Sequence, residues 1–375
     1  MRRFEVVVVG LGAIGSAALY HLARKNVPVL GIERFDLGHD RGSSHGATRV
    51  IRLSHYERLS YIPLLKRAYA LWHELEIAAG QQIVHTTGIA EIGPPDGPLV
   101  AGTLAASKTH GLEFEILHAD QLMRRFPAFR VPKNFVGVVQ PDGGFIEAAA
   151  ALDAYIRLAI EAGAQVRTGE SARSIQQTDE AVRIETDQAV YESEAAIVAL
   201  GPWTKKLLPR LPVTLEVKRQ VVGWFEPNEL SVFSADKFPV FLLESRHGIH
   251  FGLPKHTEPG IKLAKHYPYG PTIDPDNCDR LVTPDDEAGI RSAIAEFVPA
   301  ASGRLVAAKT CMYTLTPDGT FVIDRLPNCP GIIVASPCCG HGFKFAPIVG
   351  EILSDLATTG KTEHDISDFR LARFS

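Results

Sequence analysis

The stretch Phe4-Glu-Val-Val-Val-Val-Gly10-Leu-Gly12-Ala-Ile-Gly15 decides the fold, because a run of apolar residues passes directly into three spaced glycines. A helical stretch follows, and Val29-Leu-Gly-Ile-Glu33 is typical of a second strand that ends in an acid. Glu33 lies 18 residues after Gly15, close to the roughly 20 residues expected of a dinucleotide-binding βαβ unit. The sequence therefore predicts that this unit binds a cofactor containing ADP.

Each of the three glycines and the acid of this predicted βαβ unit has a separate physical role. Gly10 permits a tight turn, Gly12 allows backbone N–H groups to approach a pyrophosphate, and Gly15 allows close packing of helix on strand. The helix N-terminus attracts the phosphates, and Glu33 is expected to accept a hydrogen bond from a ribose hydroxyl.

Composition sets the class of protein. A chain of 375 residues, 45% hydrophobic and 22% charged, is long for a single core, so two domains are expected. The net charge of −4 argues against a general binder of nucleic acid or of anionic membranes. Five cysteines without a C-x-x-C pair indicate a reducing compartment, taken as the cytoplasm, with neither a disulfide framework nor a metal site. No apolar run is long enough for a membrane span.

The region after Glu33 departs from the strand–helix alternation of a nicotinamide-dependent dehydrogenase. A loop rich in glycine and histidine occupies residues 38–49, and helical patterns follow over residues 61–79 and about 147–162. Residues 82–141 indicate short strands with two helices, and residues 213–300 indicate a sheet with a helix near 285–297. Towards the end, a buried strand is predicted at 331–335 and a helix at 345–358.

These elements predict an α/β protein of two domains. A Rossmann-like cofactor domain is expected from residues 1–82, 145–212 and 301–375. It is interrupted by a discontinuous substrate domain from residues 83–144 and 213–300, built on a mixed, largely antiparallel β-sheet. The interruption of the cofactor domain favours FAD over NAD.

Motifs spread over the whole chain resemble the monomeric sarcosine oxidase and N-methyltryptophan oxidase family, which has a D-amino-acid-oxidase-type fold. Besides the glycine turn, they are Gly42-Ser-Ser-His-Gly-Ala-Thr-Arg-Val-Ile-Arg52, Arg219-Gln-Val-Val-Gly223, Gly260-Ile-Lys-Leu-Ala-Lys-His266, Cys311-Met-Tyr313 and Gly340-His-Gly-Phe-Lys-Phe345. Several such motifs in one order are far more specific than any one of them.

The resemblance implies a covalent cofactor. Cys311 matches the cysteine that forms a thioether to the flavin ring, whereas a cysteine after an apolar strand is ordinarily a small buried hydrophobe. A thiol that adds to the flavin needs a nearby cation to lower its pKa. We therefore expect a cationic side chain beside Cys311.

Arg49 and Arg52 are three positions apart, so they would share one face if this segment were a helix. On its own, this spacing favours a solvated basic stripe. The resemblance places Arg49 beside the flavin and assigns the substrate carboxylate to Arg52 and Lys344, whose charge-assisted hydrogen bonds would orient an amino acid.

Lys262 matches the lysine that activates oxygen in the family, where a fixed positive charge stabilises the anion that forms. Lys265 is the competing candidate, and three-residue spacing in a strand places the two lysines on opposite faces. His266 and His45 match active-site histidines, which would polarise the site or favour the neutral substrate amine.

The remaining assignments also follow from the resemblance. Tyr313 and Phe251 are expected to contact the substrate. The expected cofactor contacts, besides Cys311, are Gly10, Gly12, Ala13, Ile14, Gly15, Glu33, Arg34, Gly42, Ser43, Ser44, Thr48, Arg49, Ala172, Gly201, Trp203, Met312, Gly340, Gly342, Phe343 and Lys344.

Three departures from the family pattern put the substrate in doubt. Ala47 stands where members carry an aspartate, and Phe251 stands where a tyrosine hydroxyl would face the pocket. The pair Cys338-Cys339 replaces a Phe-Ser type pair. These changes leave the cofactor chemistry intact.

The expected function is FAD-dependent oxidation by O2 of a secondary, N-methylated amino acid, by a monomer that binds neither nucleic acid nor membranes. The imine formed would hydrolyse to an aldehyde and a primary amino acid, and oxygen would be reduced to hydrogen peroxide. Two alternatives are a dehydrogenase that passes electrons to a quinone or protein acceptor, and a non-catalytic FAD-binding subunit.

Overall fold

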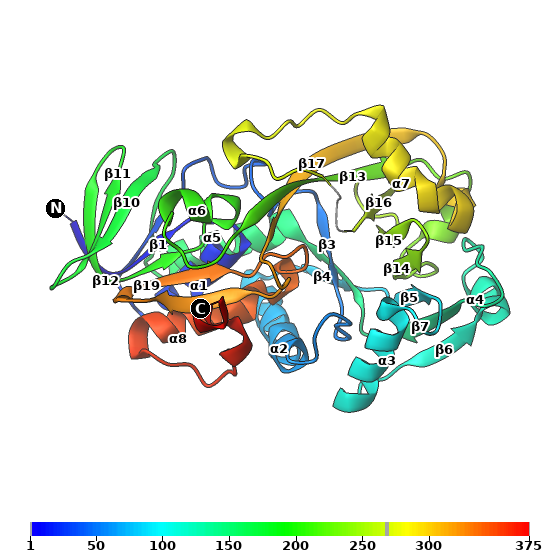
Figure 1. Cartoon of the computed structure of the whole chain (residues 1–375), viewed down its shortest axis with the longest axis horizontal. Coiled ribbons are helices and arrows are strands. Elements are labelled where there is room, and N and C mark those ends of the chain that lie inside the picture. The colour runs from blue at the N-terminus through cyan, green and yellow to red at the C-terminus, as the bar shows by residue number, and fades with distance from the viewer. Residues whose placement is uncertain (1, 267–269, 375) are drawn as a thin grey trace.

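The computed structural model describes residues 2–266 and 270–374 and contains two large sheets joined by a small one (Figure 1). In the first large sheet, the order β9-β2-β1-β12-β19 is parallel throughout, and β10, β11 and β18 extend it with antiparallel pairs. Its strands are β1 (Arg2–Val9), β2 (Val29–Ile32), β9 (Gln165–Arg167), β10 (Ala172–Gln177), β11 (Val182–Thr186), β12 (Val190–Val198), β18 (Val322–Leu326) and β19 (Cys329–Ser336).

The apolar run of β1 fits a strand that is covered on both faces. Val6 and Val8 belong to one core cluster, whereas Val7 and Val9 belong to another on the opposite face of the sheet. Alternation of side chains along a strand produces this division, and burial of both faces explains why no polar residue interrupts Val6–Val9. The first cluster is covered by α1 (Ala13–Arg24), α2 (Tyr61–Ala79), α5 (Ala148–Glu161) and α8 (Ala346–Thr359).

The second large sheet has the order β17-β13-β16-β15-β14-β5-β7-β6, in which only the β14–β5 pair is parallel among the described strands. Its strands are β5 (Ile89–Gly93), β6 (Glu115–His118), β7 (Val136–Gln140), β13 (Glu216–Phe225), β14 (Val240–Ser245), β15 (Gly248–Leu253), β16 (Ile261–Lys265) and β17 (Leu305–Leu315). The helices α3 (Pro98–His110), α4 (Ala119–Arg125) and α7 (Pro284–Phe297) lie on this side of the molecule (Figure 1). The expected mixed, largely antiparallel sheet is confirmed.

A three-stranded antiparallel sheet connects the two halves. It consists of β3 (Thr48–Ile51), β8 (Gly144–Glu147) and β4 (Val84–Thr86), in the order β3-β8-β4. Strand β3 follows directly on the glycine- and histidine-rich loop, so this loop connects β2 of the first sheet to the small sheet.

Most predicted elements agree with the structure. The helix predicted over residues 61–79 is α2, and it ends at Gly80 in the left-handed conformation that glycine favours. The predicted domain boundary at residue 300 is wrong for one strand, because β17 pairs with β13 along its length and therefore belongs to the second sheet. The segment assigned to the cofactor domain thus returns to the first sheet only after Leu315. The rest of the domain division stays a prediction.

Within the described residues, none of the helices combines the length and the apolar character that a bilayer-spanning segment requires.

Candidate active site

The glycine turn has the close contacts that its spacing predicts. Gly10 has φ +92°, and a Cβ added there would lie 2.7 Å from the carbonyl oxygen of Ala199. A Cβ on Gly15 would lie 1.7 Å from the carbonyl oxygen of Gly10. Neither position has room for a side chain, so the first turn of α1 lies directly against the end of β1. Gly12, Ala13 and Ile14 border the adjacent cavity.

Glu33 presents an ionised carboxylate at the end of β2. Its side chain accepts hydrogen bonds from the N–H groups of Leu11 at 2.8 Å and Phe35 at 3.1 Å. Although burial alone would raise the pKa of Glu33, His39 and these two amides lower it below its usual value. The carboxylate is therefore charged at neutral pH and fixed beside the glycine turn.

Two adjoining cavities contain the predicted site residues, apart from Gly15, which packs behind the turn. The first, the dinucleotide cavity, is lined by Gly10, Gly12, Ala13, Ile14, Glu33, Arg34, Gly42, Ser43, Ser44, Ala172, Gly201 and Trp203. The second, the inner cavity, is lined by Ala13, Ile14, Ser43, Ser44, His45, Thr48, Arg49, Arg52, Phe251, Lys262, His266, Cys311, Met312, Tyr313, Gly340, Gly342, Phe343 and Lys344. Because both share Ala13, Ile14, Ser43 and Ser44, they form one elongated space.

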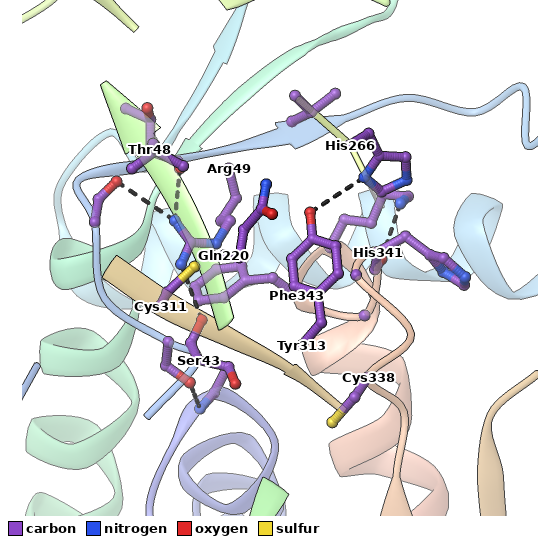
Figure 2. A pocket seen from close by; sticks show the side chains of 18 of the residues that line it. Ser43, Thr48, Arg49, Gln220, His266, Cys311, Tyr313, Cys338, His341 and Phe343 are labelled. Atoms are coloured by element: carbon purple, nitrogen blue, oxygen red, sulfur yellow. Dashed lines mark hydrogen bonds between the residues drawn. The ribbon is translucent and has the colours of Figure 1, made fainter. Parts of the chain in front are cut away.

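Arg49 lies in strand β3, so the helical arrangement of Arg49 and Arg52 considered from their spacing does not occur. Thr48 and its neighbours pair with β8 in an antiparallel sheet, and the tertiary pairing overrides the helical interpretation. The Arg49 guanidinium donates to the carbonyls of Ser43 at 2.9 Å and Thr48 at 2.8 Å, and also to that of His45 (Figure 2). These bonds hold the glycine- and histidine-rich loop around a buried positive charge.

Arg52 is buried and already paired with two carboxylates of the chain. Its Nη2 lies 2.8 Å from Glu57 Oε2, and its Nη1 lies 3.2 Å from Glu91 Oε1. Burial would lower the pKa of Arg52, but Glu57 and Glu91 raise it. Arg52, which was predicted to bind the substrate carboxylate, thus lies on the wall of the inner cavity, and Glu57 and Glu91 neutralise its charge.

Lys344 lies on the same wall and, unlike Arg52, is not held by carboxylates of the chain in its described contacts. Its Nζ donates to the carbonyl of His341 at 2.9 Å, and its own carbonyl accepts from Trp72 Nε1 at 2.9 Å. Burial, with Arg52 nearby, lowers the pKa of Lys344 to about 7. An anion that enters the cavity would therefore favour the charged form of this lysine.

Lys262 lies on the buried face of β16. Its Nζ donates to the carbonyls of Gly46 at 2.8 Å and Thr48 at 2.5 Å, which connects the second sheet to the loop before β3. Lys265 has a partly exposed side chain at the end of the strand, does not line the inner cavity, and is separated from Lys262 by three positions. Burial, with Arg49 nearby, lowers the pKa of Lys262 well below its usual value. Of the two competing lysines, only Lys262 lines the cavity.

Cys311 lies in β17 opposite Gln220 of β13, and its thiol is buried. Arg49 and Lys262 are cations near this thiol, and both lower its pKa. Burial is the larger effect and leaves the pKa of Cys311 above its usual value. Figure 2 shows Cys311 near Arg49 and Gln220 on the wall of the inner cavity.

The aromatic and histidine side chains form the rest of the wall. His266 Nδ1 lies 3.1 Å from the hydroxyl of Tyr313, and the two side chains face each other in Figure 2. Burial lowers the pKa of His266 to about 4. Burial, with Arg49 nearby, also lowers the pKa of His45 to about 4, so both rings are neutral at pH 7. The Phe251 ring meets the His266 ring edge-on, with centroids 6.3 Å apart.

Sequence reasoning missed several polar residues at this site, among them Glu57, Gln220, His341 and Asp276. Glu57, Gln220 and His341 line the inner cavity. Asp276 borders the dinucleotide cavity, where it pairs with Arg34 at 2.6 Å and accepts from Trp203 Nε1 at 2.8 Å. Gln220 and His341 belong to quoted motifs and could have been included. Neither Glu57 nor Asp276 lies in such a motif, and only the folded arrangement brings them to the site.

The residues present fit a bound FAD. The elongated space begins at a glycine turn too crowded for any side chain and ends among Arg49, Lys262 and Cys311. Both ring nitrogens of His45 are buried and have no hydrogen-bond partner among the described residues. A polar group in the inner cavity would provide one, and the ionised Glu33 is suited to a ribose hydroxyl at the other end.

The comparisons with known proteins agree with this geometry. The sequence profile of the FAD dependent oxidoreductase family matches residues 5–356. A monomeric sarcosine oxidase of Bacillus sp. strain NS-129 is 40% identical over 375 residues, covering 99% of this chain and 97% of the relative. An N-methyl-L-tryptophan oxidase of Salmonella newport is 33% identical over 385 residues and is covered completely.

A solved structure of NikD, an amino acid oxidase essential for nikkomycin biosynthesis, has a TM-score of 0.88 and 25% identity, with 99% of this chain and 98% of that chain covered. The chain therefore belongs to the FAD dependent oxidoreductase family, among the relatives of monomeric sarcosine oxidase and N-methyl-L-tryptophan oxidase.

Proposed function

We propose that this protein is an FAD-dependent oxidase of a secondary, N-methylated amino acid. The observation that carries the proposal is that one inner cavity, continuous with a dinucleotide cavity, brings together Lys344, Lys262 and Cys311. When bound, FAD would accept two electrons as the substrate loses one hydrogen from carbon and one from nitrogen to become an imine, and would pass them, with two protons, to O2, which gives hydrogen peroxide. The chain's own residues position the amino acid, set its protonation state and supply positive charge.

The substrate carboxylate is assigned to Lys344 first and to Arg52 second. The buried Lys344 Nζ donates to the carbonyl of His341, so a carboxylate can take up its remaining donors. Arg52 is held by Glu57 and Glu91, and it can contact the substrate only if its bonds to Glu57 loosen. The substrate thus competes with Glu57 for one guanidinium.

The same charges favour the reactive form of the substrate amine. A secondary amine must lose its proton before its lone pair can assist C–H cleavage, and nearby cations disfavour an ammonium group. Lys344 borders the cavity and can supply this charge, whereas Arg52 is neutralised by Glu57 and Glu91, and the neutral ring of His266 adds no charge at pH 7. Orientation by the carboxylate then fixes the carbon to be oxidised at near-contact distance from its acceptor.

Reduction of O2 is assigned to Lys262. A fixed positive charge in a water-poor site stabilises the superoxide-like anion as electrons reach oxygen. The Nζ of Lys262 is held by the carbonyls of Gly46 and Thr48, and Arg49 adds a charge nearby. Although burial and Arg49 lower the pKa of Lys262, an anion forming on oxygen would favour its charged form. The described geometry supports an oxidase over a dehydrogenase because both cations line the cavity.

We also propose that Cys311 carries the flavin through a thioether. The C–S bond would replace the thiol S–H bond and one C–H bond of the flavin 8α-methyl group, and the two electrons released would pass to the flavin and then to O2. Two cations lie near its buried thiol, and its strand faces the inner cavity. The test is acid denaturation of the purified protein. Flavin is expected to remain with the wild-type polypeptide and to be released from Cys311→Ala, whereas acid-stable flavin in that variant would overturn the link. Cys278→Ala, a partly exposed cysteine outside the cavity, is the matched control.

The carboxylate assignment has its own test. Arg52→Ala is expected to raise KM for carboxylated amines far more than it changes the flavin spectrum, and Lys344→Met is expected to do the same. Arg58→Ala, at an exposed arginine paired with Asp368, is the control. Equal activity of the wild-type enzyme on an amino acid and on its decarboxylated amine would contradict the assignment.

The decisive experiment mixes the oxidised protein, without air, with sarcosine and separately with N-methyltryptophan. Bleaching of the yellow flavin band by one of them is expected, because an N-methyl amino acid satisfies both the carboxylate and the amine sites. Rapid return of the band in air would support the oxidase over the dehydrogenase. A flavin band unchanged by both compounds would overturn the N-methyl amino acid assignment.

We propose further that the enzyme acts as a cytoplasmic monomer, with a small amino acid and O2 as its partners. Two relatives with 40% identity are called monomeric sarcosine oxidases, and the cysteine usage fits a reducing compartment. Size-exclusion chromatography with light scattering tests the monomer, and a mass near twice 40.8 kDa would contradict it.

A further inference from the structure

Two histidines and a glutamate converge outside the two cavities of the candidate active site. His85 lies in β4, Glu147 ends β8, and His256 lies in the connection from β15 to β16. His85 Nε2 lies 2.7 Å from Glu147 Oε1, and His256 Nε2 lies 2.8 Å from the same oxygen. None of the three lines either cavity, and the function proposed above does not use them.

A buried aromatic ring orients both imidazoles. Phe145 is 1% exposed, and the His85 ring stacks on it with centroids 4.8 Å apart and an interplanar angle of 13°. The His256 ring meets Phe145 edge-on, with centroids 4.9 Å apart. This packing limits rotation of the rings and keeps both Nε2 atoms directed towards Glu147.

The backbone under each of these residues is also fixed. Glu147 pairs with Thr48 in the small sheet, and its N–H donates to the carbonyl of Ile83 at 2.9 Å. The segment that carries His256 is held by Lys255, whose Nζ donates to the carbonyls of His256 and Glu258. The backbone that carries these side chains is therefore already ordered, which reduces the conformational entropy lost when a ligand binds.

The donor set matches a zinc ion. Two imidazole nitrogens and one carboxylate oxygen are the protein ligands of a Zn²⁺ site that keeps one position for water. Zn–ligand bonds of about 2.0–2.1 Å imply donor atoms about 3.4 Å apart in a tetrahedron. The three donor atoms lie within 4.8 Å of one another, so each has to move only slightly. Side-chain exposures of 22% for His85, 31% for Glu147 and 24% for His256 leave a path for the ion and its water.

We propose that His85, Glu147 and His256 bind one Zn²⁺ ion, with water as the fourth ligand, in a site independent of the flavin chemistry. The ion would join β4 and β8 of the small sheet to the segment that precedes β16. Glu147 pairs with Thr48, whose carbonyl accepts from Lys262. The ion is thus expected to stabilise the junction behind Lys262 and to take no part in the reaction.

The sequence gives little indication of this site, and the expectation of no metal rested on cysteine spacing alone. His85 and Glu147 are 62 positions apart, and Glu147 and His256 are 109 apart. Such separations match no local metal-binding motif.

The test uses the tag-free holoprotein, stripped with a chelator and dialysed against Zn²⁺ at about pH 7.5. One ion per chain is expected, with a rise in Tm because the ion binds only the folded state. His85→Ala, His256→Asn and Glu147→Gln are each expected to lower the affinity at least about tenfold and to abolish the rise in Tm. His73→Ala, at an exposed histidine in α2, is the control that should bind as the wild type does.

The flavin absorption band reports whether each variant has folded, and the conservative Glu147→Gln guards against a general loss of structure. Equal zinc affinity in the wild type and in all three variants would overturn the proposal. Wild-type protein that binds no zinc would also overturn it and leave a hydrogen-bonded triad.

Discussion

Arg52 Nη2 lies 2.8 Å from Glu57 Oε2, so the guanidinium expected to hold a substrate carboxylate is already neutralised by a carboxylate of its own chain. Although burial would raise the pKa of Glu57, Arg52 and His55 hold it well below its usual value. The Glu57 carboxylate is therefore a permanent competitor for the substrate at neutral pH.

Glu57→Gln should tighten carboxylate binding, because an uncharged amide holds Arg52 less strongly than a carboxylate does. The expected effect is a dissociation constant for propionate lower by about tenfold, or about 1.4 kcal/mol, measured by perturbation of the flavin spectrum. A lower Tm is expected as well, since a buried charge loses its partner. Glu74→Gln, which changes an exposed carboxylate paired with Arg67, is the control, and weaker propionate binding in Glu57→Gln would contradict the competition.

Lys262→Met should slow the reaction of reduced enzyme with O2 by about 10²–10³-fold, the usual effect of removing one stabilising charge or donor. Reduction of the flavin by substrate in the absence of air should change much less, because Lys262 acts after that step. Stopped-flow absorbance separates the two half-reactions. Lys265→Met, three positions along the same strand, should leave both rates near those of the wild type. A similar slowing in both variants would remove the special role of Lys262.

Carboxylate binding should weaken as pH rises through neutrality. The pKa of Lys344 is lowered to about 7, so the ammonium is present below that pH in the free enzyme and is lost above it. Because a bound carboxylate raises this pKa, the dissociation constant for propionate should change little between about pH 6 and 7 and rise up to about tenfold per unit above pH 7. Propionate has no amine and its carboxylate stays ionised over this range, so the profile there reports the enzyme alone. Lys344→Met should bind weakly and show no such rise; an unchanged profile in that variant would assign the titration elsewhere.

Ala47→Gly should stabilise the protein by up to about 1 kcal/mol, because Ala47 has a left-handed backbone with φ 61° that a Cβ disfavours. The extra flexibility of glycine in the unfolded chain offsets part of the gain. The free energy of unfolding in urea measures the difference. Ala149→Gly, at an exposed position inside α5, should be destabilising by about 1 kcal/mol, which shows that glycine is favourable only at position 47.

The sequence predicts best where local chemistry determines the structure. The glycine turn and Glu33 follow from the space a cofactor needs, and α2 ends at Gly80 because only a residue that tolerates left-handed φ can stop it there. The helix interpretation of Arg49 and Arg52 failed because pairing of β3 with β8, nearly a hundred positions away, decides their conformation. Residue spacing contains no information about such a distant partner.

The electrostatic environment of the site residues could not be predicted from the sequence either. A cation near Cys311 was expected and is present twice, yet burial outweighs both charges and the pKa of the thiol rises. Glu57 and Asp276 reach the site from segments outside the quoted motifs, so their pairing with Arg52 and Arg34 emerges only from the fold.

The hydroxyl of Ser43 donates to the carbonyl of Met312 at 2.7 Å, across 269 positions of the chain. On a ribosome, which adds about 5–20 residues per second, the glycine turn emerges long before β17 has been made. The N-terminal residues of the cavity therefore lack the wall that β17 forms until synthesis is almost complete. Retention of the flavin is thus a late event of biogenesis, and truncated chains that end before β17 should leave the ribosome without it.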